Sequence, residues 1–313
     1  MADILVEPPS TPVEAAVNRP LRGGRSRRVR TSGGPFRLIG RPFVWAWAVF
    51  NVALLVWIAL QSFRNGEESF SKPFGLPRSF NFDNYRSALD VGQLGSSFVN
   101  TVVIAGSATC VTISLASLAA YVLSRTRTRS ASPLTTFFAM GMGIPAQAVI
   151  LPMFVMMQSV TTWMNDNFGW WDDRLSLFLV YVATSLPFAV FLLTAFFRSL
   201  PSELEEAAAL DGCPPLRVFF KVMLPLAKPG IITAFILTLM GLWNETLLAL
   251  TFITDNAQYT LPQALLGLYG TMQYTSNWGG LFAGVVIVVL PIVILYVFLG
   301  RRIVEGMTLG AGK

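Results

Sequence analysis

The sequence contains no histidine and only two cysteines among its 313 residues. Without an imidazole side chain, the protein cannot use histidine for acid–base chemistry or as a metal ligand. Cys110 lies in an apolar run and Cys213 in a polar loop, and this spacing matches no metal-binding motif. We therefore expect two free thiols, no bound metal and no cofactor.

Charged residues are scarce as well. They make up 13% of the chain, whereas a soluble domain has roughly 25%. Hydrophobic residues reach 53%, and the mean hydropathy is +0.57. A helix needs about 20 apolar residues to cross a bilayer core of about 30 Å. Six segments are long enough: 43–63, 97–124, 133–158, 175–197, 230–254 and 281–300. The composition thus predicts an all-α integral membrane protein with six transmembrane helices.

Lysine and arginine lie mostly on one side of these six segments. Eighteen of the 23 occur before the first segment, after the second, after the fourth or after the last. Loops rich in these residues stay in the cytoplasm, so we expect both termini there. The net charge of +6 is then a signal of membrane topology and indicates no nucleic-acid partner.

Three regions are expected along the chain. Residues 1–42 have many Arg, Pro, Gly and Ser residues and no hydrophobic periodicity, which predicts a disordered cytoplasmic tail on the lipid surface. Residues 43–300 form the transmembrane domain, and residues 301–313 form a second cytoplasmic tail. The final "GMTLGAGK" looks like a phosphate-binding loop, but Met307 occupies the position of its first glycine. We therefore expect no ATP binding by this chain.

Residues 198–229, between the fourth and fifth segments, form a polar and proline-rich stretch that we call the polar loop. Ser202, with Glu205 three residues later, has the pattern of a capping box and predicts the start of a helix. Asp211 and Gly212 predict its end, and Pro215 suits the first turn of a second short helix. The second helix would carry an exposed apolar stripe of Leu216, Phe219, Phe220 and Met223. Such a stripe favours docking to a partner protein, and the alternative is an amphipathic hairpin on the lipid surface.

The polar loop resembles the EAA loop of permease subunits in binding-protein-dependent ABC importers. In that family Glu-Ala-Ala is followed by three residues and then Gly, and further on by Leu-Pro. The matching residues here are Glu206, Ala207, Ala208, Asp211, Gly212, Leu224 and Pro225. The stretches "FDNYRSAL", "LPFAVFLLTAFFRSLPSELEEAA" and "WNETLLAL" are similar to the carbohydrate branch, in particular the smaller maltose-type subunit. Residues 1–42 lie outside the resemblance, and Cys213 stands where the branch commonly has Ala.

The resemblance implies a permease subunit of a sugar or oligosaccharide importer in the bacterial cytoplasmic (inner) membrane, not an enzyme. Its partners would be a second homologous permease, two copies of a cytoplasmic ABC ATPase and an extracytoplasmic substrate-binding protein. The polar loop would contain the coupling helix that sits on the ATPase, whose cycle drives alternating access. The Gly-rich C-terminal end would either reach the ATPase dimer or fray.

The same resemblance implies roles for three residues of the polar loop. Glu206 would offer a charge to basic groups of the ATPase. Asp211 would cap the following helix or accept a bond from the ATPase. Gly212 would permit the bend and a close backbone approach.

Two other functions stay open at this point. One is a permease of another ABC importer branch, for amino acids, polyamines or phosphate esters. The other is a membrane scaffold or receptor without transport activity, which would not copurify with an ATPase.

Glu245 is the acidic residue that stands out inside a predicted transmembrane segment, where a charge costs roughly 2.5–3.5 kcal/mol. Gly241, Trp243 and Asn244 precede it in the same segment. Asn244 and Glu245 either bond to neighbouring helices or line the translocation path, with Trp243 as a stacking face for a sugar.

Prolines and aromatic residues mark two further features. Four prolines interrupt the predicted segments: Pro145, Pro152, Pro187 and Pro291. Proline is common in membrane helices, but broken helices also line the cavities of transporters. The outer loops 64–96, 159–174 and 255–280 are rich in Trp, Tyr and Asn. They would either receive the loaded binding protein or form an aromatic belt at the membrane surface.

Overall fold

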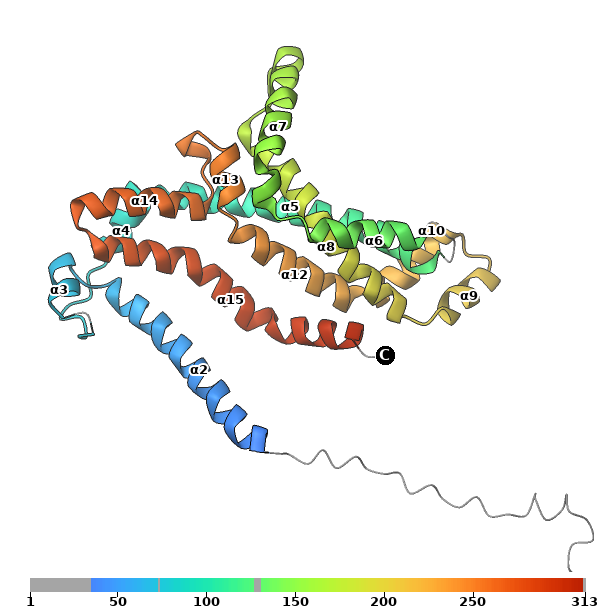
Figure 1. The fold of residues 1–313 in the computed structure, drawn as a ribbon, viewed down its shortest axis with the longest axis horizontal. Coiled ribbons are helices and arrows are strands. Elements are labelled where there is room, and N and C mark those ends of the chain that lie inside the picture. Colours follow the sequence, from blue (N-terminus) through green and yellow to red (C-terminus); the bar gives the residue numbers. More distant parts are fainter. Residues whose placement is uncertain (1–34, 73, 127–130, 312–313) are drawn as a thin grey trace, which may run out of the picture. The chain divides into compact units, whose positions relative to one another are not determined.

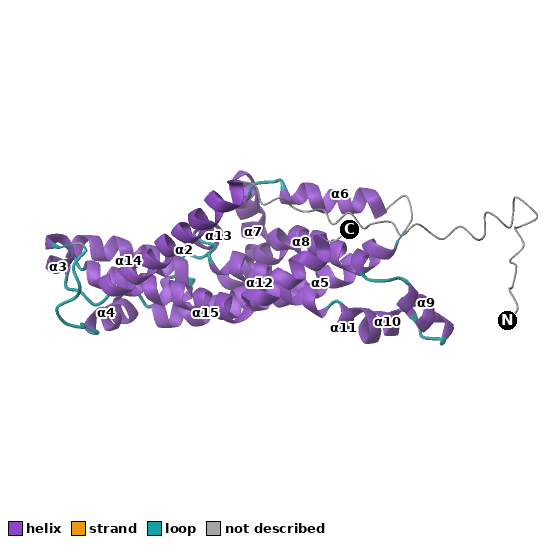
Figure 2. Cartoon of the chain, turned by 90° about the horizontal axis from the view of Figure 1, so that it is seen from below, coloured by secondary structure: helices purple, strands orange, loops and turns teal. Residues whose placement is uncertain are grey.

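The computed structural model describes residues 35–72, 74–126 and 131–311, and this part contains helices and turns but no strand (Figures 1 and 2). The predicted all-α fold is thereby confirmed. Residues up to Ala53 form one unit and residues from Leu54 onward form a second. The contacts described below lie within the second unit.

The helical elements follow one another with short connections. In chain order they are α2 (Pro35–Gln61), α3 (Gly66–Ser71), α4 (Asp83–Val91), α5 (Leu94–Arg125), α6 (Ala131–Met142), α7 (Ala146–Phe168), α8 (Asp173–Ser199), α9 (Glu203–Leu210), α10 (Pro215–Val218), the π-helix η1 (Phe219–Met223), α11 (Leu224–Leu226), α12 (Lys228–Trp243), α13 (Leu247–Phe252), the 3-10 helix η2 (Asn256–Gln258), α14 (Leu261–Thr275) and α15 (Trp278–Ala311). Of the predicted N-terminal tail, residues 1–34 lie outside the described part. The last helix, α15, continues through most of the expected C-terminal tail.

Four of these helices contain stretches long and apolar enough to cross a membrane: Gly40–Gln61, Leu94–Arg125, Asp173–Ser199 and Trp278–Gly300. Two further apolar stretches are pairs of helices that bend sharply at a short break. The axes of α6 and α7 differ by 98°, and the stretch Pro215–Leu226 differs from α12 by 74°. The predicted number of six spans is reached when each bent pair counts as one span.

The predicted segment 133–158 is wrong as a single helix, because the chain breaks between α6 and α7 (Figure 1). Pro145 lies at this break with an extended backbone, directly before α7. Proline has no N–H to donate and disfavours a helical conformation in the residue before it. The other three prolines lie inside α7, α8 and α15, so one of the four lies at a break between helices.

The predicted segment 230–254 is also interrupted. Helix α12 ends at Trp243 and α13 starts at Leu247. Residues 244–246, which include two of the predicted path residues, form the connection that we call the 244–246 break. Apolar residues on both sides conceal this break from a hydropathy pattern.

Helices α5 and α8 have the most extensive contact among the described elements. Small side chains allow two membrane helices to approach closely, and three alanines in this contact are completely buried: Ala116, Ala120 and Ala189. The same hydrophobic cluster includes Phe219 and Met223 of the polar loop. The start of α12 packs on α8 as well, because a side-chain carbon at Gly230 would overlap the ring of Phe196. Buried residues of the polar loop, Phe219 and Met223, thus attach it to the transmembrane core.

Candidate functional site

The polar loop begins with α9, whose predicted N-terminal cap is absent. Ser202 has helical backbone angles and makes no side-chain bond to the N–H groups of the first turn, so the predicted capping box is wrong. A capping side chain reaches those groups from a non-helical, usually extended, backbone. The carboxylate of Glu205 instead accepts a hydrogen bond from Nε of Arg125, at 2.6 Å.

The end of α9 has the predicted bend. Gly212 has a φ of +74°, in the left-handed region that favours glycine. Its N–H donates to the carbonyl of Ala209, and the N–H of Cys213 donates to the carbonyl of Ala208, both at 3.0 Å. These two bonds form a Schellman motif, which satisfies carbonyl groups at the helix end. The N-cap residue of α10 is Pro214, which makes no side-chain bond to the helix, and Asp211 is exposed.

The second part of the polar loop differs from the single exposed stripe that we predicted. Pro215 starts α10 as expected, and the chain then widens into the π-helix η1. Phe219 and Met223 are buried against the transmembrane core, whereas Leu216 and Phe220 are exposed. The ring of Phe219 packs against aromatic residues of α5 and α8, which explains why half of the stripe turns inward.

The residues of the EAA-like motif form two groups. Ala208 and Leu224 are half-buried and pack against the hydrophobic cluster beneath them. The other members are exposed: Glu206, Ala207, Asp211, Gly212 and Pro225. Beside them Leu210 and Leu216 have 90% and 71% exposed surface. The outer face of the polar loop therefore combines small side chains, two carboxylates and two prominent leucines.

At the 244–246 break, both oxygens of the Glu245 carboxylate accept hydrogen bonds. Oε1 accepts from the N–H of Leu248 at 2.9 Å, and Oε2 accepts from the N–H of Ala249 at 3.1 Å. The hydroxyl of Tyr181 donates to Oε2 at 3.2 Å. The first N–H groups of a helix have no partner within it, so Glu245 caps α13 and joins it to α8.

The other predicted path residues differ in their exposure. Trp243 is buried, and its ring lies 5.7 Å from that of Phe98 in an edge-on arrangement. Asn244 is exposed, and its amide donates to the carbonyl of Met240 at 2.8 Å. Gly241 is exposed too, with open space where a side chain would begin. In this conformation Gly241 and Asn244 form an exposed surface, whereas Trp243 belongs to the core.

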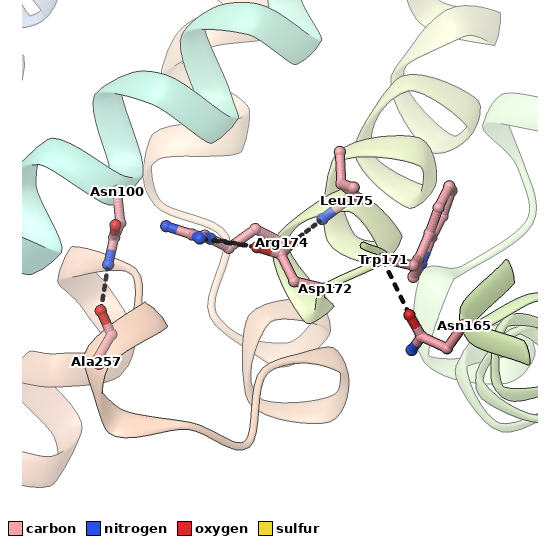
Figure 3. Close-up of polar contacts among 7 residues, drawn as sticks. All are labelled: Asn100, Asn165, Trp171, Asp172, Arg174, Leu175 and Ala257. Carbon is pink, nitrogen blue, oxygen red and sulfur yellow. Dashed lines mark hydrogen bonds and ion pairs between the residues drawn. The ribbon is translucent and has the colours of Figure 1, made fainter. Parts of the chain in front are cut away.

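The sequence did not identify a polar group at the start of α8 (Figure 3). Asp172 accepts two bonds from Arg174, at 2.8 and 2.9 Å, and caps α8 through a bond from the N–H of Leu175 at 3.1 Å. Asn100 of α5 donates to the carbonyl of Ala257 at 3.0 Å. Asp172, Arg174 and Asn100 line a cavity of about 440 Å³ between α5 and α8. No local pattern could have linked Asn100 to the two charges, because they lie far apart in the sequence.

Comparison with known proteins identifies the family. Residues 112–308, more than half of the chain, match the family described as binding-protein-dependent transport system inner membrane component. The chain belongs to this family. Membership makes the protein a multi-pass component of an inner-membrane transport system.

Several relatives can be aligned with this chain over most of its length. The diacetylchitobiose uptake system permease of Streptomyces coelicolor is 34% identical over 285 residues, which are 91% of this chain and 92% of the relative. The trehalose transport system permease of Mycobacterium tuberculosis is 33% identical over 238 residues, 76% and 84% of the two chains. The melibiose/raffinose/stachyose import permease of Bacillus subtilis is 30% identical over 258 residues, 82% and 90% of the two chains.

One solved structure has a similar fold. It is a bacterial ABC transporter involved in the import of the acidic polysaccharide alginate, with a TM-score of 0.68 and 22% sequence identity. The match covers 86% of this chain and 97% of the other. The broken helices described above therefore belong to a fold that occurs in ABC transporters.

Proposed function

We propose that this family member is a permease subunit of an ABC importer and forms half of a translocation pathway for a sugar or oligosaccharide. The observation that carries the proposal is the outer face of the polar loop, where a glycine bend, small side chains and exposed leucines lie together. The substrate class is supported by three relatives whose names contain diacetylchitobiose, trehalose and melibiose.

The polar loop would bind a cytoplasmic ABC ATPase through this outer face. Gly212 exposes the backbone of the bend, with no side chain between it and the partner. Leu210 and Leu216 would enter apolar pockets, where buried anchors supply most of the binding energy. Glu206 would form a charge-assisted hydrogen bond with a basic group of the ATPase. Closure of two ATPases around ATP would then push the polar loop and the spans attached to it, which drives alternating access.

The complete importer would contain a second homologous permease, two copies of the ATPase and an extracytoplasmic substrate-binding protein. Both termini and the polar loop would lie in the cytoplasm, as the distribution of lysine and arginine predicts. The chain itself would hydrolyse no ATP and carry no cofactor, because its contribution is mechanical.

Gly241 and Asn244 would line the path beside the 244–246 break. An amide both donates and accepts hydrogen bonds, which suits the hydroxyl groups of a sugar, and Gly241 leaves space for the ligand. Glu245 would act indirectly, because both of its oxygens already accept bonds that fix the break. Trp243 would support the break from the side of the core.

Purification of the tagged chain in mild detergent tests the proposal. We expect an ABC ATPase and a second polytopic permease to remain bound, as identified by mass spectrometry. Reconstituted in vesicles with its binding protein, the assembly should take up a labelled oligosaccharide only when ATP is supplied. A chain that is purified alone and folded would contradict the importer. ATP-dependent uptake of an amino acid or a polyamine in place of the oligosaccharide would keep the importer and replace its substrate class.

A further inference from the structure

One ion pair connects the last residue of α5 to the first turn of α9. Nε of Arg125 donates to Oε1 of Glu205 at 2.6 Å, and the two side chains are only 20% and 19% exposed. In each of the other ion pairs of the described residues, at least one side chain is much more exposed. Shielding from water strengthens a charge-assisted hydrogen bond, so this pair is the firmest polar link between the polar loop and the spans.

Arg125 also contacts a third element. Its Nη2 donates to the carbonyl of Leu200 at 3.2 Å, and Leu200 is the residue directly after the end of α8. Carbonyl groups at a helix end have no partner within the helix, and positive charge is favoured there. A single guanidinium group therefore joins α5, the end of α8 and α9.

An aromatic contact lies one helical turn before Arg125. The ring of Tyr121 lies 5.0 Å from the ring of Phe219 in η1 and 5.8 Å from that of Phe197 in α8. The polar loop is thus held near its beginning by Glu205 and near its middle by Phe219. Both attachments lead to the same two helices, α5 and α8.

We propose that Arg125 is a positioning residue that makes α5, α8 and the polar loop move as one body. The inference rests on the proposed function, in which an ATPase moves the polar loop. Without the guanidinium group, α9 would follow the spans only through the short connection after α8 and through apolar contacts that can slide. A displacement of α9 would then be lost before it reached α5.

The first test compares transport with ATP hydrolysis in the reconstituted importer. We expect Arg125→Gln and Glu205→Gln each to lower the number of substrate molecules moved per ATP by roughly tenfold, which corresponds to about 1.4 kcal/mol. The double variant should be no worse than Arg125→Gln alone, because that substitution already removes the contact with Glu205. Arg198→Gln is the matched control, since Arg198 is an exposed arginine in the last turn of α8. Unchanged ratios, or losses that multiply in the double variant, would overturn the proposal.

The second test needs no partner and uses the native thiol of Cys213. This side chain is half-buried against the cluster beneath the polar loop, one residue after the Gly212 bend. In a Cys110→Ser background, we expect Arg125→Gln and Arg125→Lys to raise the labelling rate of Cys213 several-fold, because α9 is no longer held down. Lysine keeps the charge but lacks the forked donors that contact two groups at once.

The two tests separate the positioning role from the proposed function. If the wild-type chain neither binds an ATPase nor transports, the proposed function fails, and Cys213 labelling still reports on the link. If the wild-type importer works and Arg125→Gln changes neither the labelling rate nor the transport ratio, the positioning role fails alone. A variant that assembles poorly is judged by the labelling rate of its membrane-inserted chains relative to Arg198→Gln.

Discussion

The polar loop and the 244–246 break both separate helices, but their polar side chains point in opposite directions. The polar loop turns at Gly212 and leaves carboxylates and large apolar side chains on its outer face. The 244–246 break brings a carboxylate inward, where it accepts two backbone N–H bonds and a tyrosine hydroxyl. Within a bilayer every polar backbone group needs a partner inside the protein, whereas polar groups outside the bilayer can bond to water or to another protein. The exposed leucines and carboxylates of the polar loop thus mark a site for a partner, whereas the bonded carboxylate of Glu245 marks a joint within the chain.

The largest expected effect is that of Gly212→Pro. Proline fixes φ near −65°, which is incompatible with the φ of +74° at this bend. We expect the chain to insert in the membrane but to lose binding of the ATPase, so that uptake falls to background. Gly212→Asn is the matched control, because asparagine tolerates the left-handed region better than other residues. Uptake by the proline variant equal to that of the asparagine variant would show that the bend is not needed.

A large loss of stability is expected from Glu245→Ala. It removes the cap of α13 and leaves two N–H groups without their acceptor, at a cost of about 2 kcal/mol. Tyr181→Phe removes one hydrogen bond and should cost about 1 kcal/mol. Thermal unfolding in detergent measures both values. A Glu245→Ala chain as stable as wild type, with uptake lost, would mean that this carboxylate contacts the substrate instead.

Asn244 is adjacent to Glu245, but we expect Asn244→Ala to lower uptake and to leave stability unchanged. Its side chain is exposed, so we expect little change in thermal unfolding. Uptake should fall about fivefold, as for the loss of one hydrogen bond of about 1 kcal/mol to the substrate. The comparison of Asn244→Ala with Glu245→Ala would fail if both variants lost stability and uptake in the same proportion.

The smallest effect on the chain itself is expected for Leu210→Ser. Leu210 is 90% exposed, so its replacement should change the free energy of unfolding by less than about 0.5 kcal/mol. Binding of the ATPase should nevertheless weaken, which titration of the purified subunits would measure. Met223→Ser is the contrasting variant, since Met223 is fully buried and its loss should destabilise the chain before it affects binding. Equal binding by wild type and Leu210→Ser would exclude Leu210 from the contact.

Features that depend on neighbouring residues could be predicted from the sequence, and contacts between distant residues could not. Apolar runs revealed the helical membrane fold, because bilayer thickness sets their length. The bend at Gly212 followed from neighbouring residues, since a Schellman motif is local. Glu205, in contrast, bonds to a residue 80 positions away, so the local capping pattern with Ser202 was misleading. The 244–246 break was hidden because apolar residues flank it on both sides, and because Tyr181, which bonds to Glu245, lies 64 positions away.

The π-helix η1 determines which way the side chains after it face in the polar loop. The N–H of Leu224 donates to the carbonyl of Phe219, five residues earlier, so this turn contains one residue more than an α-helical turn. If the same five residues wound as an ordinary α-helix, the chain after them would rotate by about 100° and would enter α12 out of register. The wide turn absorbs the extra residue, so that Met223 stays in the core. A variant that lacks the exposed Lys221 should therefore form an ordinary turn and still bury Met223.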